Sequence, residues 1–138
     1  MNYIEDRATN INPQKDFKEL LESNKKLRVK LGVDPTAPDV TLGWYAILRM
    51  LRKFQDYGHT AVLILGEFTA QVGDPSGKSE TRKVIDESEI DNNSKGVLPI
   101  IKSVLNKDNL EIVSNKDWLS KLSIEEMMSL ASKTTLAQ

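Results

Sequence analysis

The sequence predicts an α/β fold with a parallel sheet, because two strand patterns flank a helical pattern. Residues 60–65 are an unbroken β-branched and aliphatic run between two glycines, which is typical of a strand buried on both faces. Residues 27–33 alternate apolar and basic side chains before Pro35, as in a strand that ends at a turn. Between them, residues 42–57 place apolar side chains at steps of three and four, the spacing of an amphipathic helix. The order strand, helix, strand favours parallel pairing.

The remaining elements follow from helix signals and short apolar runs. Residues 14–24 repeat apolar side chains at helical spacing just after Pro13, a residue that favours helix starts. Ser123 and Glu126 have the spacing of a capping box, so a helix is expected to begin there. In chain order, we further expect a flexible arm over 1–12, a polar loop over 67–82, a helix over 97–105 with Pro99 in or near its first turn, and a strand over 110–113.

Size and composition indicate one ordinary domain. A chain of 138 residues can bury about two thirds of its unfolded surface, and we see no repeat or linker that divides it. The 19 basic residues nearly balance the 20 acidic ones, so no overall positive field exists to hold a polyanion. The longest apolar run, 61–65, is far shorter than the roughly 18 residues of a membrane span, and the N-terminus lacks a signal-peptide layout. We therefore expect a cytoplasmic protein without a membrane partner.

A short polar segment, Asp34-Pro35-Thr36, directly follows the first predicted strand. The carboxyl ends of parallel strands face the crevice in which open α/β sheets bind ligands, and the start of the following helix favours anions. The same three residues also make an ordinary Asp-Pro turn that merely reverses the chain. The segment alone leaves both interpretations open.

Three stretches carry a family resemblance. They are LGVDPTAPDVTLGW (31–44), GEFTAQVGDPSGK (66–78) and NKDWLSKLS (115–123). Together they resemble the catalytic domain of bacterial tyrosyl-tRNA synthetases, closely over 27–82 and more weakly toward the C-terminus. The resemblance implies a Rossmann-like parallel sheet with flanking helices, in which 1–138 is a partial, nucleotide-binding catalytic domain: the truncated N-terminal half of a class I synthetase catalytic domain.

The first stretch resembles the adenylate site of the family. The resemblance implies that Gly32, Asp34, Thr36 and Gly43 bind ATP and the aminoacyl-adenylate. In the family, the glycine corresponding to Gly43 lets adenine pack against the helix start. ATP would bring Mg²⁺ as its counter-ion, without a metal site on the protein.

Thr41 and Trp44 stand at the two histidine positions of the family's His-Ile-Gly-His or His-Leu-Gly-His motif, so they are the candidate catalytic positions. In the family, those histidines stabilise charge that develops on the α-phosphate of ATP in the transition state. A threonine hydroxyl can still donate one hydrogen bond, as in the Thr-Ile-Gly-Asn of related tryptophanyl enzymes. The indole of Trp44 could stack on adenine, fill and block the adenine site, or simply belong to the core.

The second stretch resembles the tyrosine site. Thr69 and Asp74 match the family pattern Gly-x-x-Thr-x-x-x-Gly-Asp-Pro, in which the aspartate accepts from the α-ammonium of tyrosine and the threonine lies nearby. Residues 74–77 are also a good β-turn sequence, so a purely structural role stays open. Lys30 stands where many members place a tyrosine that meets the substrate phenol. It could serve that oxygen, or it could face solvent.

Two further features of the sequence do not lead us to predict a binding site. Arg49, Arg52 and Lys53 form a basic stripe at helical spacing, but one stripe on a nearly neutral chain is usually a solvated helix face. The chain has no cysteine and a single histidine, His59, so we predict no metal site.

Several family features are absent from the 138 residues: the Tyr-x-x-x-Gln helix, the Lys-Met-Ser-Lys-Ser loop and the RNA-binding domains. We therefore expect a fragment or truncated paralogue of a tyrosine-tRNA ligase. We expect this chain to bind tyrosine and ATP but to be inactive alone. It would bind tRNA only if the missing domains complete it. The alternatives are a non-catalytic paralogue that still binds tyrosine or nucleotide, and an interaction module, because 118–131 resembles the segment where these enzymes dimerise. Uncovered apolar surface would favour a homo-oligomer or a complementing chain.

Overall fold

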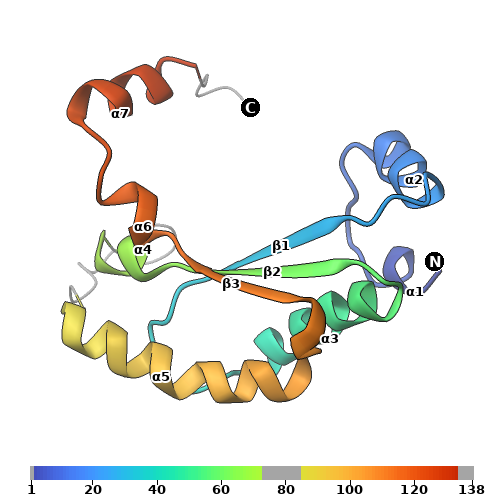
Figure 1. Cartoon of the computed structure of the whole chain (residues 1–138), viewed down its shortest axis with the longest axis horizontal. Coiled ribbons are helices and arrows are strands. Elements are labelled where there is room, and N and C mark those ends of the chain that lie inside the picture. Colours follow the sequence, from blue (N-terminus) through green and yellow to red (C-terminus); the bar gives the residue numbers. More distant parts are fainter. Residues whose placement is uncertain (1, 73–84, 134–138) are drawn as a thin grey trace.

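The computed structural model describes residues 2–72 and 85–133, and Figure 1 shows one sheet with helices packed against one of its faces. In chain order the elements are α1 (Asn2–Glu5), α2 (Gln14–Glu22), β1 (Arg28–Val33), α3 (Leu42–Asp56), β2 (Thr60–Leu65), α4 (Glu67–Val72), α5 (Glu87–Val104), the 3₁₀ turn η1 (Lys107–Asn109), β3 (Leu110–Ser114), α6 (Lys116–Leu119) and α7 (Ile124–Ala131).

The sheet has the strand order β1-β2-β3, and both neighbouring pairs are parallel. At the carboxyl ends of the strands, Val33 lies opposite Leu65, which in turn lies opposite Ser114. The predicted α/β fold with a parallel sheet is confirmed, including the adjacent pairing of the first two strands. All three strands consequently end at the same edge of the sheet.

The hydrophobic core lies between the sheet and the helices α3 and α5, which Figure 1 shows below the strands. The central strand β2 is almost wholly buried, which explains its unbroken apolar sequence. On β1, by contrast, Arg28 and Lys30 are exposed while Val29 and Leu31 pack on the core. The buried cluster comprises Val33, Leu48, Leu51, Ala61, Leu63, Leu65, Val97, Ile101 and Leu105.

Helix α5 begins far earlier than the predicted start near 97. Asp86 caps it, because its carboxylate accepts a hydrogen bond of 2.8 Å from the Glu89 N–H. Pro99 therefore lies in the helix interior and not in or near the first turn, which corrects the prediction. A proline there removes one N–H, the partner of the Lys95 carbonyl, and the long helix tolerates this loss.

The expected polar loop over 67–82 is also partly wrong, because residues 67–72 form the short helix α4. Ala70 donates a backbone hydrogen bond of 2.8 Å to Gly66, and the Phe68 N–H donates to the Asn115 side chain at 2.9 Å. The long-range contact from Asn115 satisfies a donor at the helix start that local sequence leaves open. Residues 73–84 lie outside the described part of the chain.

The N-terminal segment contains α1, whose Ile4 is buried. Glu5 of this helix lies 3.7 Å from Lys18 of α2, and α2 itself confirms the helix predicted after Pro13. The flexibility of the arm over 1–12 stays a prediction.

At the C-terminal end, α7 starts with the predicted capping box. The Ser123 hydroxyl accepts from the Glu126 N–H, while the Glu126 carboxylate accepts from the Ser123 N–H at 2.8 Å. The hydrogen bond from the Ser123 backbone, followed by that from the Ser123 side chain, lowers the pKa of the Glu126 carboxyl group. Figure 1 shows α7 reaching away from the sheet, and none of its residues is buried. Among the described residues, no helix is both long and apolar enough to cross a membrane.

Candidate functional site

Three residues, one after each strand, lie together where the parallel strands end. Asp34 follows β1, Gly66 follows β2 and Asn115 follows β3. Backbone hydrogen bonds extend the pairing one step past the strands, because Gly66 donates to Val33 at 2.8 Å and Asn115 donates to Leu65 at 2.9 Å. The sheet thus fixes these groups at the edge where open α/β sheets bind ligands.

A chain of hydrogen bonds connects the polar side chains at this edge. The Asn115 amide donates to the Thr69 hydroxyl at 3.0 Å, and that hydroxyl lies 2.8 Å from the Asp34 carboxylate oxygen Oδ1, to which it donates. Asn115 is only 7% exposed, and its Oδ1 accepts from the Phe68 N–H. The Asp34 carboxylate is therefore oriented by groups from all three strand ends.

Two residues of this arrangement, Asn115 and Gly66, were not among the predicted site residues. Asn115 positions Thr69 through its hydrogen bond to the Thr69 hydroxyl. The sequence feature that could have indicated this role is a polar residue directly after the third strand. At Gly66, an added Cβ would lie 1.7 Å from Asp34 Oδ1 and 2.7 Å from Thr69 Oγ1. A glycine is thus required for the close approach of both side chains.

A cavity of about 230 Å³ opens beside this network. It brings together four predicted site residues, Gly32, Asp34, Thr36 and Trp44. Small-molecule pockets usually measure roughly 300–1,000 Å³, so this one encloses only part of a ligand as large as an adenylate. The rest of the lining is apolar and consists of Leu31, Val33, Ile47 and Leu48.

The two predicted adenylate glycines have free space around them. A Cβ at Gly32 would meet nothing within 4 Å, and a Cβ at Gly43 would come no closer than 3.7 Å to the Thr41 hydroxyl. Neighbouring atoms therefore leave room for a larger residue at Gly32 and at Gly43, whereas they do not at Gly66. The open space fits a role in which a ligand approaches the backbone closely.

Thr41 and Trp44 occupy the start of α3. The Thr41 hydroxyl caps the helix by accepting from the Trp44 N–H at 3.3 Å, which leaves its own hydrogen available for donation. The Trp44 side chain is half-buried; it packs against the core cluster and also forms a wall of the cavity. The indole thus belongs to the core and to the cavity wall together.

The remaining predicted site residues do not join this group. Lys30 is exposed on β1 and does not line the cavity. Asp74, the predicted partner of the substrate ammonium, lies outside the described residues. Within 2–72 and 85–133, no group of three or more histidine, aspartate or glutamate side chains is arranged to hold a metal ion.

An ion pair between Lys116 and Glu87 links α6 to the start of α5 near this edge. The hydrogen bond to Glu87, followed by the attraction of its charge, raises the pKa of Lys116. Because both side chains are substantially exposed, the pair contributes little to stability. The pair joins the residue after Asn115 to the start of α5.

The sequence matches a family model described as tRNA synthetases class I (W and Y) over residues 22–138. The curated tyrosine–tRNA ligase of Carboxydothermus hydrogenoformans is 46% identical over 122 residues, which span 88% of this chain and 30% of that protein. The tyrosine–tRNA ligase of Thermotoga maritima is also 46% identical, over 87% of this chain and 31% of its own length. The chain therefore spans about a third of the length of these relatives.

Solved structures share the fold. The tyrosyl-tRNA synthetase of Archaeoglobus fulgidus, complexed with L-tyrosine, aligns with a TM-score of 0.73 at 17% identity, covering 93% of this chain and 38% of its own. A C-terminally truncated mitochondrial tyrosyl-tRNA synthetase from Coccidioides posadasii aligns with a TM-score of 0.69 at 24% identity, over 90% of this chain and 37% of its own. Since the family model covers most of the sequence, the chain belongs to the class I tRNA synthetases of the W and Y group.

Proposed function

We propose that this chain forms the tyrosine- and ATP-binding part of a cytoplasmic tyrosine–tRNA ligase. The observation that carries the proposal is the Asn115–Thr69–Asp34 chain of hydrogen bonds at the carboxyl edge of the sheet, beside a cavity that includes Gly32. A parallel sheet presents ligands with such an edge. The 46% identity to curated tyrosine–tRNA ligases favours this chemistry.

The proposed adenylate side of the site consists of Gly32, Asp34, Thr36 and Gly43. The two glycines admit the ligand to the backbone, and the amides at the start of α3 favour its phosphates. ATP would carry its own Mg²⁺. On the tyrosine side, Thr69 and Asp74 would meet the amino end of the substrate, and Lys30 its phenol.

Activation of an amino acid joins its carboxylate to the α-phosphate of ATP and releases pyrophosphate. This chain would contribute orientation of the two substrates and one hydroxyl donor, that of Thr41, at the motif positions. Losing a single preorganised donor typically costs about 10²- to 10³-fold in rate, and here both imidazoles are replaced. We therefore expect no tyrosine-dependent ATP–pyrophosphate exchange above background from this chain alone; exchange near the rate of an ordinary synthetase would contradict this expectation.

Tyrosine binding tests the proposal directly. Titration with L-tyrosine, followed by NMR, should shift the amides of Asp34 and Thr69, whereas 3-(4-hydroxyphenyl)propionate, which lacks the ammonium, should not. Asp74→Asn should weaken tyrosine binding by about ten-fold or more, because it removes a charge-assisted hydrogen bond. Asp16→Asn, at an exposed position of α2, is the matched control. Equal binding of the two compounds would reject a site for the amino acid.

The exposed apolar side chains of α7 favour a second candidate function, an interaction module that pairs with another chain. A monomeric soluble domain rarely exposes a contiguous apolar patch without a partner for it. In this alternative, the preserved sheet edge would serve mainly to hold the fold together.

A further inference from the structure

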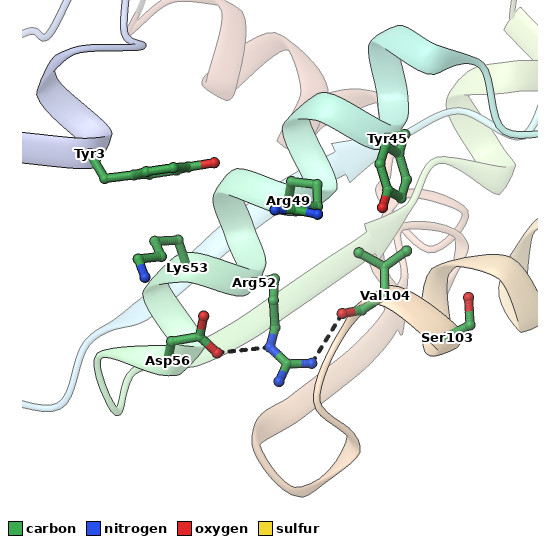
Figure 2. A pocket seen from close by; sticks show the side chains of 8 residues that line it. All are labelled: Tyr3, Tyr45, Arg49, Arg52, Lys53, Asp56, Ser103 and Val104. Atoms are coloured by element: carbon green, nitrogen blue, oxygen red, sulfur yellow. Dashed lines mark hydrogen bonds and ion pairs between the residues drawn. The ribbon is translucent and has the colours of Figure 1, made fainter.

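A second cavity of about 470 Å³ lies between α1, α3 and the end of α5. Figure 2 shows the side chains that surround it: Tyr3, Tyr45, Arg49, Arg52, Lys53, Asp56, Ser103 and Val104. None of the described residues that line it also lines the smaller cavity at the strand edge. The basic stripe of α3, which the sequence alone left as a solvated helix face, thus forms one wall of a cavity that is open to solvent.

The lining residues leave an excess of positive charge. Among them are three basic side chains and one carboxylate, a net charge of two. Arg52 is already engaged, because its Nε donates to Asp56 at 2.9 Å and its Nη1 donates to the Val104 carbonyl at 3.1 Å. Within residues 2–72 and 85–133, neither Arg49 nor Lys53 has a carboxylate at ion-pair distance. Their two charges are the uncompensated ones.

Hydrogen-bond donors surround the uncompensated charges. In Figure 2 the hydroxyl of Tyr3 points toward Arg49, and the hydroxyl of Tyr45 lies on the other side of the same guanidinium. The neighbouring Tyr45 side chain raises the pKa of Arg49. The Lys53 ammonium lies 5.7 Å from the ring centroid of Tyr3 and 5.3 Å from that of Tyr57, so it is placed between α1 and the end of α3.

We propose that this cavity binds a small phosphomonoester, with its phosphate between Arg49 and Lys53. A phosphomonoester carries about −1.5 to −2 charges at neutral pH, which matches the two uncompensated positive charges. Its oxygens accept hydrogen bonds, and guanidinium, ammonium and phenol groups can all donate them. A volume of about 470 Å³ exceeds the need of a bare phosphate and leaves room for an organic group.

Ser103 suggests the character of that organic group. Its hydroxyl donates to the Ile100 carbonyl at 2.6 Å, so its oxygen remains free to accept from a ligand hydroxyl. A sugar supplies such donors. Sugar phosphates and nucleoside monophosphates share this chemistry, and ribose 5-phosphate and adenosine 5′-monophosphate separate the two sources in an assay.

The test is an NMR titration of the whole chain with ribose 5-phosphate, with ribose as the uncharged control. Ribose 5-phosphate should shift resonances of Tyr45, Arg49 and Lys53, and ribose should not. Because charge-assisted hydrogen bonds are lost, Arg49→Gln and Lys53→Gln should each weaken binding about ten-fold or more. Lys95→Gln, which removes an exposed lysine of α5 outside the cavity, should leave it unchanged. Thermal unfolding of each variant shows whether the fold is kept.

Charge and ligand class give further readouts. Binding should weaken as the pH falls from about 7.5 to 5.5, because the phosphate takes up a proton near pH 6. Tighter binding of adenosine 5′-monophosphate, with shifts at the same residues, would assign the site to nucleotides. Shifts only at Gly32 and Asp34 would place the ligand in the proposed adenylate site and overturn the proposal. Unchanged binding in both glutamine variants would also overturn it. So would preferential binding of an RNA oligonucleotide that lacks a terminal phosphate.

Discussion

Thr69 and Asp34, 35 positions apart in the sequence, are joined by a hydrogen bond of 2.8 Å at the carboxyl edge of the sheet. The oxygen of the Thr69 hydroxyl accepts a hydrogen bond from the Asn115 amide at 3.0 Å. The single hydrogen of this hydroxyl is therefore available to be donated to the Asp34 carboxylate, which can only accept. The Gly66 carbonyl, at 3.2 Å, is the second acceptor within reach. The position of the carboxylate therefore depends on residues after all three strands.

Gly66→Ala should disrupt this arrangement. The new Cβ would lie 1.7 Å from Asp34 Oδ1, so the carboxylate and Thr69 must both move. Overpacking of this kind typically costs about 1–3 kcal/mol, which urea denaturation would measure. Gly43→Ala is the matched control, because its Cβ meets only the Thr41 hydroxyl at 3.7 Å in ordinary contact. Equal stability of the two variants would show that the packing at Gly66 is looser than the structure indicates.

Asn115→Ala should lower stability and detach α4 from the sheet edge. The substitution leaves the part-buried Phe68 N–H without its side-chain acceptor, which should cost about 1 kcal/mol, the lower end of the range for an unsatisfied donor. Hydrogen exchange at the Phe68 amide should accelerate. Asn92→Ala, at an exposed position of α5, should change neither quantity. Unchanged exchange at Phe68 in Asn115→Ala would remove the positioning role of Asn115.

The sheet was predictable from sequence because the strands carry their own patterns. The apolar run of β2 reflects burial on both faces, and the alternation in β1 reflects burial on one. The first half of α5 was missed, because its inward face includes buried polar residues. Asn93, for example, donates to the Pro35 carbonyl at 3.1 Å, a contact between distant segments that hydrophobic spacing does not reveal.

The candidate site was predictable only in part, for a similar reason. A local sequence motif at the end of β1 was enough to predict four of the site residues. The structure places these four around one cavity: Gly32, Asp34, Thr36 and Trp44. Asn115 acts through hydrogen bonds to α4, about 47 positions away, and no local pattern encodes such a contact.

The pair of substitutions Thr41→His and Trp44→His should strengthen ATP binding, and calorimetry measures the change in affinity. Trp44 walls the cavity that holds Gly32 and Asp34, so a smaller ring widens it, and two imidazoles restore donors for phosphate oxygens. Because Trp44 is only half-buried, the loss of stability should be about 1–3 kcal/mol, below the range for a fully buried aromatic. Trp44→Phe with Thr41 kept is the control, since it retains an apolar wall. A large loss of stability without tighter ATP binding would mean that Trp44 serves the core alone.

We expect the chain to self-associate through α7. Ile124 and Met128 are 77% and 69% exposed, and they lie four positions apart on one face of the helix, next to Met127. Burying one such side chain contributes about 1.5–3 kcal/mol, so Met128→Lys should raise the dissociation constant by roughly ten-fold or more. Sedimentation velocity at tens of micromolar should show assemblies larger than a monomer for the unmodified chain and mainly monomer for Met128→Lys.

Ser129→Lys is the matched control for this change, because it adds the same charge to α7 at an exposed polar position. It should leave the association intact, since it removes no apolar side chain. If both lysine variants dissociate equally, added charge rather than apolar contact explains the effect, and the face formed by Ile124, Met127 and Met128 is not the interface. A clean monomer for the unmodified chain at the same concentration would show that these side chains remain solvated, and would also remove the support for an interaction module.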